Sequence, residues 1–190
     1  MVEARTVILF PPETDQERFD GVSIALHWLT VLLVAGQFTS ALVREDLHGP
    51  IVGLLLVFHR SAGVALWAVA ALRLTWRHKF AYLPPFPANM PRLQQCAAKL
   101  NEYGLYGLLL LQPLTGLAAT LTRGKAFTLF LWDVPGLMAP DKPLAHVLAE
   151  IHEAGAWAMA ALIGLHAAAG LFHGLVLRDR VLQRMMPSQN

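Results

Sequence analysis

The 190-residue sequence contains little charge. Asp, Glu, Lys and Arg make up 15% of the chain, whereas 55% of the residues are hydrophobic and the mean hydropathy is +0.46. A soluble domain carries about 25% charged residues, so this composition excludes an ordinary cytosolic enzyme and indicates lipid as the solvent. The formal net charge of +2 is too small to argue for a nucleic-acid partner.

Cysteine is also scarce. Cys96 is the single cysteine, so the chain has no internal disulfide and no Cys-x-x-Cys motif for a metal or for covalent haem attachment. The apolar segments contain no paired carboxylates and no phosphate-binding loop. Any cofactor must therefore be held non-covalently and must carry the chemistry itself.

Long segments of the chain lack charge almost completely. Nothing charged lies between Asp20 and Arg44, between Glu102 and Arg123, or between Glu153 and Arg178, and a further apolar window is interrupted only by Arg60. Because about 20 apolar residues span a bilayer, we predict an all-α fold, an integral membrane four-helix bundle over residues 21–178. The helices are expected near 22–43, 51–74, 103–121 and 147–177, with polar tails at 1–20 and 179–190.

The connections and the cations define a topology. Proline-rich residues 84–91 predict an irregular link with a short amphipathic piece near 93–100, a second Pro/Gly-rich link covers 132–143, and no internal repeat is evident. Most lysines and arginines fall on the side that carries both termini, so the positive-inside rule predicts that both termini are cytoplasmic in a bacterial inner membrane. The opposite side carries Arg44, Arg123, Lys125 and Lys142.

Histidine, in contrast, is abundant, with eight in the chain. His27, His59, His152 and His166 lie inside the predicted helices, where ionisable groups are rare and functional by default. A single such histidine could equally be a neutral residue that hydrogen-bonds to a neighbouring helix. Several histidines at matching depths favour a shared chemical role.

Helix geometry sorts these histidines into two levels. Given the helix directions, His27 and His166 share the inner level, and His59 and His152 share the outer one. His152 and His166 are separated by about 1400° and about 21 Å of rise, so they face the same side of the bundle. His173 is the alternative inner residue, but it would lie about 31 Å from His152, close to the full thickness of the hydrocarbon layer.

Stacked pairs of imidazoles suit two haems, because six-coordinate haem iron takes an axial nitrogen from each side. A zinc site would need three or four ligands at one level. Small side chains follow His166, at Ala167, Ala168 and Ala169. They leave space for a flat porphyrin, or simply allow close helix packing. Arg60 is costly at its depth unless it is partnered, and a haem propionate beside His59 is a suitable partner; snorkelling to the surface is the alternative.

Several ordered segments resemble the bacterial cytochrome b561 family, over about residues 18–187. They are Ser23–Trp28, Phe58–Gly63, Thr122–Gly124, Ile151–Glu153, Ile163–Ala169 and Leu182–Pro187. In that family four helices hold two non-covalent haem b groups, and the histidines that match its ligands are His27, His59, His152 and His166.

The resemblance implies superoxide oxidation at the outer face, with ubiquinone in the membrane as the electron acceptor. An anionic donor needs a positively charged surface to approach, which Arg123 and Lys125 can provide, although contact with lipid headgroups is their alternative role.

The second implied function is a cytochrome b subunit that relays electrons between a partner dehydrogenase or hydrogenase and quinone, docked through the apolar stretch 127–132. A transporter or purely structural membrane protein is a third class, and it predicts histidines without iron. Hydrogen-bonding groups available for a quinone are Trp28, Gln37, Thr39, Ser40 and Gln112.

Overall fold

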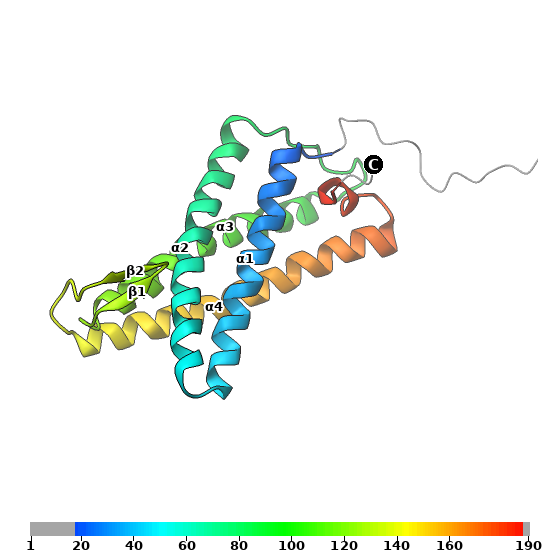
Figure 1. Cartoon of the computed structure of the whole chain (residues 1–190). Helices are drawn as coiled ribbons and strands as arrows, with labels where there is room; N and C mark the ends of the chain where they lie inside the picture. Colours follow the sequence, from blue (N-terminus) through cyan, green and yellow to red (C-terminus); the bar gives the residue numbers. More distant parts are fainter. Residues whose placement is uncertain (1–17, 188–190) are drawn as a thin grey trace, which may run out of the picture.

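The protein is a bundle of long helices, seen in a computed structural model that describes residues 18–187. The helices are α1 (Gly21–Asp46), α2 (Pro50–Lys79), α3 (Arg92–Leu121) and α4 (Lys142–Leu171). Helices α1 and α2 lie side by side as one pair, α3 and α4 form a second pair, and the two pairs cross (Figure 1). All four helices are long and apolar enough to span a membrane, which confirms the predicted four-helix membrane bundle.

All four helices extend beyond their predicted bounds, and the one expected over 22–43 runs from Gly21 to Asp46. The helix expected over 103–121 begins at Arg92, the one expected over 147–177 begins at Lys142, and the one expected over 51–74 continues to Lys79. The amphipathic piece near 93–100 is therefore the first part of α3 and not a separate helix. Gaps in charge mark only the apolar part of a span, so the polar turns at its ends were missed. These turns are held in place by an ion pair of 2.9 Å between Arg77 and Glu102.

The start of α1 is fixed by Asp20. Its carboxylate accepts hydrogen bonds from the backbone N–H of Ser23 at 2.9 Å, from the Ser23 hydroxyl at 2.7 Å and from Trp76 Nε1 at 3.0 Å. Burial raises the pKa of Asp20, but the hydrogen bonds outweigh burial and leave the pKa below its usual value. Asp20 is therefore ionised at neutral pH, where it caps α1 and ties it to α2.

The surface of the helices is apolar along their length. Leu32, Leu54 and Trp157 have 69%, 65% and 65% of their area exposed, as expected for side chains that face lipid. The enclosed core is small and contains Leu66, Ala70, Leu109 and Met159. Met159 lies midway between His152 and His166 in α4, so this apolar layer separates the two histidine levels.

A short hairpin connects α3 to α4, and its second strand falls in the Pro/Gly-rich link expected over 132–143. Strand β1 (Phe127–Leu129) pairs antiparallel with β2 (Trp132–Val134). The hairpin lies against α2 (Figure 1), and its turn is tied there by a 2.6 Å hydrogen bond from the N–H of Phe130 to the Ser61 hydroxyl. Gly124 precedes it with φ +65°, and a Cβ there would lie 2.7 Å from the Pro140 nitrogen, so glycine is required.

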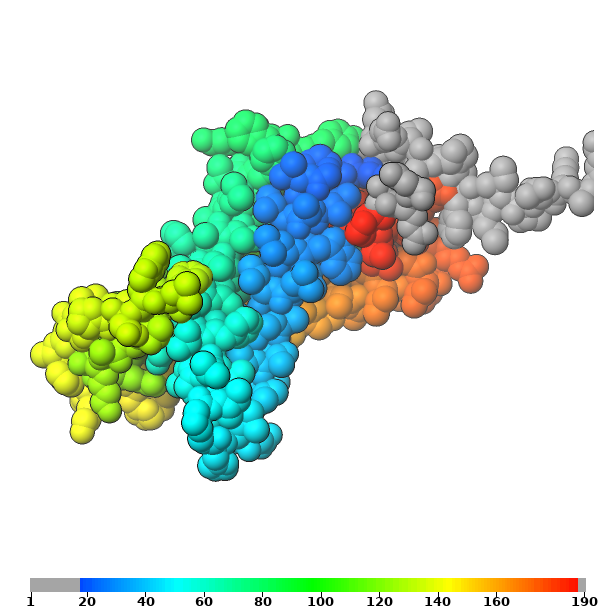
Figure 2. Space-filling view, viewed as in Figure 1, coloured from blue at the N-terminus to red at the C-terminus, as the bar shows by residue number. Residues whose placement is uncertain are grey.

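The described part of the C-terminal tail folds back onto the bundle. Helix α4 continues as a π-helical segment, η2 (Phe172–Leu177), and the chain then reverses at Arg178 with φ 53° into the 3₁₀ turn η3 (Gln183–Met185). Trp28 Nε1 donates to the carbonyl of Met185 at 2.9 Å. Figure 2 shows this red segment between the blue start of α1 and the orange end of α4. Of the tails predicted at 1–20 and 179–190, residues 1–17 and 188–190 lie outside the described residues.

Candidate functional site

Two pairs of histidines face each other between the helix pairs. His27 of α1 lies opposite His166 of α4, with ring centroids 6.2 Å apart and an interplanar angle of 57°. His59 of α2 lies opposite His152 of α4, also at 6.2 Å, with an angle of 81°. We name the first the tail-side pair, because Trp28 beside it contacts the C-terminal tail, and the second the hairpin-side pair, because Ser61 beside it contacts the hairpin. The structure thus brings together the same pairs that helix geometry predicts.

The ring separation fits one metal ion between each pair. An imidazole nitrogen binds a metal at about 2 Å, and the ring centre lies about 1 Å further back, so two axial imidazoles on one iron have centroids about 6 Å apart. Within residues 18–187 no group of three or more His, Cys, Asp or Glu side chains could hold a metal ion. Next to His166 the side chains of Ala167, Ala168 and Ala169 are small and exposed, so the tail-side pair has an open flank for a planar cofactor.

The hairpin-side pair is surrounded by hydrogen-bonding side chains. Ser40 Oγ lies 3.0 Å from Nδ1 of His59, and Gln37 Nε2 donates to the His59 carbonyl at 2.9 Å. Thr115 Oγ1 lies 3.1 Å from Nδ1 of His152, and Gln112 donates to the carbonyl of that histidine at 2.8 Å. Ser40, Gln37 and Gln112, considered from sequence as quinone contacts, are therefore already engaged with the histidine pair.

Gly116 of α3 packs directly against the ring of His152. A Cβ at this position would lie 2.9 Å from Cε1 and 3.2 Å from Nδ1 of the imidazole. Real Cβ atoms almost never approach a neighbour closer than this, so glycine is needed for the ring to occupy its position. Gly63, one turn beyond His59, has no such role, because a Cβ there would make only ordinary contacts with Gln37, the nearest at 3.8 Å.

The tail-side pair has a cationic neighbour that sequence reasoning missed. Arg73 Nη2 lies 3.0 Å from Nδ1 of His27, and the guanidinium also lies over the ring of Tyr106, 5.5 Å from its centroid. Among residues 18–187 Arg73 has no carboxylate within ion-pair distance, so this positive charge fits an anionic group of a bound cofactor. The sequence does contain a signal for this position. The number of residues from His59 to Arg73 equals the number from His152 to His166, so Arg73 lies at the same level as His166.

Positive charge also gathers beside the hairpin-side pair. Arg60 lies over the ring of Phe127, 5.6 Å from its centroid, and Arg44 and Arg123 are near enough to repel it. We name these three residues the arginine cluster; within residues 18–187 none of them forms an ion pair. Arg123 and Lys125 are both exposed, as a role in attracting a diffusing anion requires. Arg44 was missed as a site residue because sequence reasoning used it only for topology.

His173 has a different position from His166. It is buried, its Nδ1 bonds to Asp179, and its Nε2 lies 3.0 Å from Nε2 of Gln94. These contacts close the turn that reverses the chain after α4. A Cβ on Gly174 would lie 2.9 Å from Leu182, so this glycine makes room for the tail and not for a cofactor.

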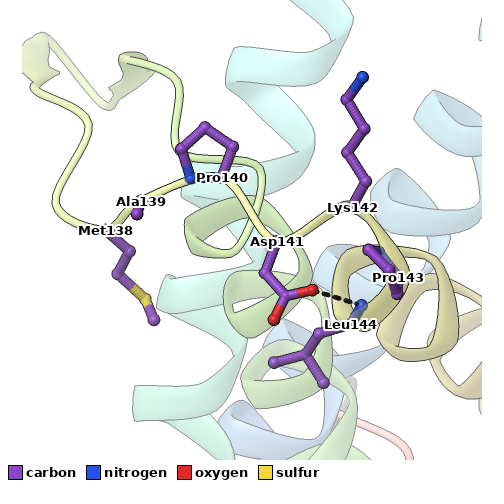
Figure 3. A pocket seen from close by; sticks show the side chains of 7 residues that line it. All are labelled: Met138, Ala139, Pro140, Asp141, Lys142, Pro143 and Leu144. Carbon is purple, nitrogen blue, oxygen red and sulfur yellow. Dashed lines mark hydrogen bonds between the residues drawn. The ribbon is translucent and has the colours of Figure 1, made fainter.

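Two hollows lie outside the histidine pairs. A surface hollow is lined by residues 138–144, where the Asp141 carboxylate accepts from the Leu144 N–H (Figure 3). A smaller, partly open hollow of about 20 Å³ lies between Ser23, Arg73, Tyr106 and Met185. Neither hollow contains a histidine, and the smaller one has room for little more than a water molecule.

The model of the family described as prokaryotic cytochrome b561 matches residues 18–188. Cytochrome b561 homolog 1 of Escherichia coli (strain K12) is 33% identical over 175 residues, which cover 90% of this chain and 97% of that protein. Cytochrome b561 homolog 2 of the same organism is 28% identical over 173 residues, which cover 90% of this chain and 92% of that protein. The probable superoxide oxidase CybB of Yersinia pestis is 28% identical over 173 residues, which cover 91% of this chain and 98% of that protein.

Proposed function

The chain belongs to the prokaryotic cytochrome b561 family of haem b membrane electron-transfer proteins, and on this premise we propose that it oxidises superoxide and reduces ubiquinone. Two superoxide anions release two dioxygen molecules, and their two electrons, with two protons, convert one ubiquinone to ubiquinol. The observation that carries the proposal is the repeated histidine pair, with centroids 6.2 Å apart at both levels. The probable superoxide oxidase of Y. pestis among the relatives favours this substrate.

Each histidine pair is assigned one haem b. His27 and His166 would hold the haem at the tail side, and His59 and His152 would hold the haem at the hairpin side. Haem b supplies one-electron oxidation and reduction when bound. Arg73 and Arg60 would supply positive charge to the haem propionates, and the apolar layer around Leu66 and Met159 would keep water from the space between the two levels.

The hairpin side is assigned to the outer face of a bacterial inner membrane. The tail side carries most of the cations, so the positive-inside rule places both termini in the cytoplasm. The arginine cluster and Lys125 then face the compartment from which superoxide arrives. Their positive charge attracts the anion and raises its local concentration beside His59. Ubiquinone reaches the protein from the lipid.

The test supplies enzymatically generated superoxide to the purified protein with a water-soluble ubiquinone, and measures ubiquinol by its absorbance. Ubiquinol formation is expected at low salt and should slow as ionic strength rises, since electrostatic steering is screened. Arg123→Glu is expected to slow it by about tenfold or more. Arg92→Glu is the matched control, because Arg92 is an exposed arginine at the other end of α3. Haem-containing protein that forms no more ubiquinol than a His59→Ala variant would contradict the proposal.

The second function is a cytochrome b subunit that passes electrons between a partner dehydrogenase or hydrogenase and quinone. The exposed tip of the hairpin favours it, because Leu131 and Trp132 have 95% and 73% of their area exposed and large exposed apolar groups mark protein or membrane contacts. A co-purifying dehydrogenase that reduces the haem, together with inactivity toward superoxide, would establish this role in place of the first.

A further inference from the structure

The same small hydrogen-bonding motif occurs on both sides of the hairpin-side pair. Gln37 and Ser40 of α1 reach His59 on α2, and Gln112 and Thr115 of α3 reach His152 on α4. In each case the glutamine amide donates to the backbone carbonyl of the histidine, and the hydroxyl three residues later contacts its Nδ1. The motif is too short to stand out as a repeat in the sequence.

The direction of the hydroxyl protons determines which histidine nitrogen carries hydrogen. Ser40 Oγ donates to the carbonyl of Gln37 at 2.9 Å, and Thr115 Oγ1 donates to the carbonyl of Gln112 at 2.9 Å. A hydroxyl has one proton, so each oxygen has only lone pairs left for the imidazole. In this arrangement both histidines donate from Nδ1 to the hydroxyl oxygens.

A second contact gives the same result for His152. Its Nδ1 lies 3.0 Å from the carbonyl oxygen of Gln112, which can only accept. With the proton fixed on Nδ1, the neutral ring has its lone pair on Nε2. This is the form of histidine that binds a metal through Nε2.

We propose that Ser40 and Thr115 are positioning residues that hold His59 and His152 with Nε2 free for haem iron and that lower the reduction potential of that haem. The inference rests on the proposed function in one respect, namely that haem b binds at the hairpin-side pair. An acceptor at Nδ1–H makes the imidazole a stronger electron donor to the metal. A stronger donor stabilises ferric iron more than ferrous iron, which lowers the potential.

The tail-side pair has no equivalent motif. The group nearest to Nδ1 of His27 is the guanidinium of Arg73, which cannot accept a hydrogen bond. Within residues 18–187 the ring of His166 makes no hydrogen bond. Removing the two hydroxyls should therefore change one haem and leave the other unchanged. Arg44 and Arg60 remain near His59 in every variant, so their charge does not affect the comparison.

The experiment is a spectroelectrochemical redox titration of the purified full-length protein carrying Ser40→Ala, Thr115→Val or both. Each single substitution is expected to lower the preference of the site for ferric over ferrous haem about tenfold, which corresponds to a rise of about 59 mV in one midpoint potential. The second midpoint potential should not move. Ser40→Thr and Thr115→Ser retain the hydroxyl and should restore the wild-type value.

Matched controls come from the same helices. Thr30 in α1 donates to the carbonyl of Leu26, and Thr120 in α3 donates to the carbonyl of Gly116, and neither hydroxyl contacts a histidine. Thr30→Val and Thr120→Val should leave both potentials at the wild-type values. If Ser40→Ala cannot retain haem, Ser40→Cys should give a smaller rise, because sulfur is a weak acceptor.

Two haems with unchanged potentials in the hydroxyl-free double variant would overturn the inference while leaving the proposed function intact. Wild-type protein that binds no haem would instead overturn the proposed function. The two failures are thus distinguished by the haem content of the wild-type sample.

Discussion

Replacing His166 with alanine is expected to remove one haem b and to leave the other in place. The substitution deletes one of the two axial nitrogens at the tail side, and His27 alone cannot complete six-coordinate iron. The haem-to-protein ratio should fall to about half of the wild-type value, because the hairpin-side pair keeps both of its imidazoles. Pyridine haemochrome absorbance against amino-acid analysis measures this ratio.

His173→Ala is the matched control for this prediction, since the two histidines lie on the same helical stretch of the chain. His173 contacts Gln94 and Asp179 and does not face His27. The variant should bind the wild-type amount of haem, although its C-terminal tail should become easier to digest with protease. Loss of a haem from His173→Ala, with both haems retained in His166→Ala, would show that the tail-side pair is wrongly assigned.

Gly116→Val is expected to abolish haem binding at the hairpin side while the tail-side haem remains. The new Cβ would lie 2.9 Å from Cε1 of His152, so the ring must move away from its position opposite His59. Overpacking of this kind costs about 1–3 kcal/mol, and displacement of a metal ligand lowers affinity by about 10- to 100-fold or more. Haem content and the number of redox transitions measure the effect.

Gly107→Val provides the control for Gly116→Val on the same helix. It makes the same change in helix propensity, but apart from its chain neighbours and the backbone of its own helix no described atom lies within 4 Å of the position where its Cβ would be. This variant should keep both haems. If both valine variants lose haem equally, a general weakening of α3 is responsible, and close packing of Gly116 on His152 is not the cause.

The histidine pairs could be predicted from the sequence because both helix direction and helix period are visible in it. Gaps in charge give the spans and their alternating direction, and the interval between His152 and His166 places both residues on one face of α4. Those two facts suffice to pair His27 with His166 and His59 with His152. The structure adds the ring separation, which depth arguments cannot supply.

The residues that support the pairs were harder to predict, because their roles depend on neighbours from other helices. Thr115 and Gly116 are ordinary residues in an apolar span until His152 is seen packed against them. Arg73 was counted only among the cations that fix the topology, although its interval from His59 places it at the tail-side level. The hairpin was missed because each of its strands has only three residues, too short for alternation to be recognised.

The haem stoichiometry of the purified wild-type protein tests the central claim most directly. Each histidine pair should bind one haem b, so the pyridine haemochrome spectrum together with a protein assay should give two haems per chain, and a redox titration should resolve two transitions. A folded, purified chain without b-type absorbance, or one that binds a single haem at full saturation, would contradict the two-pair assignment.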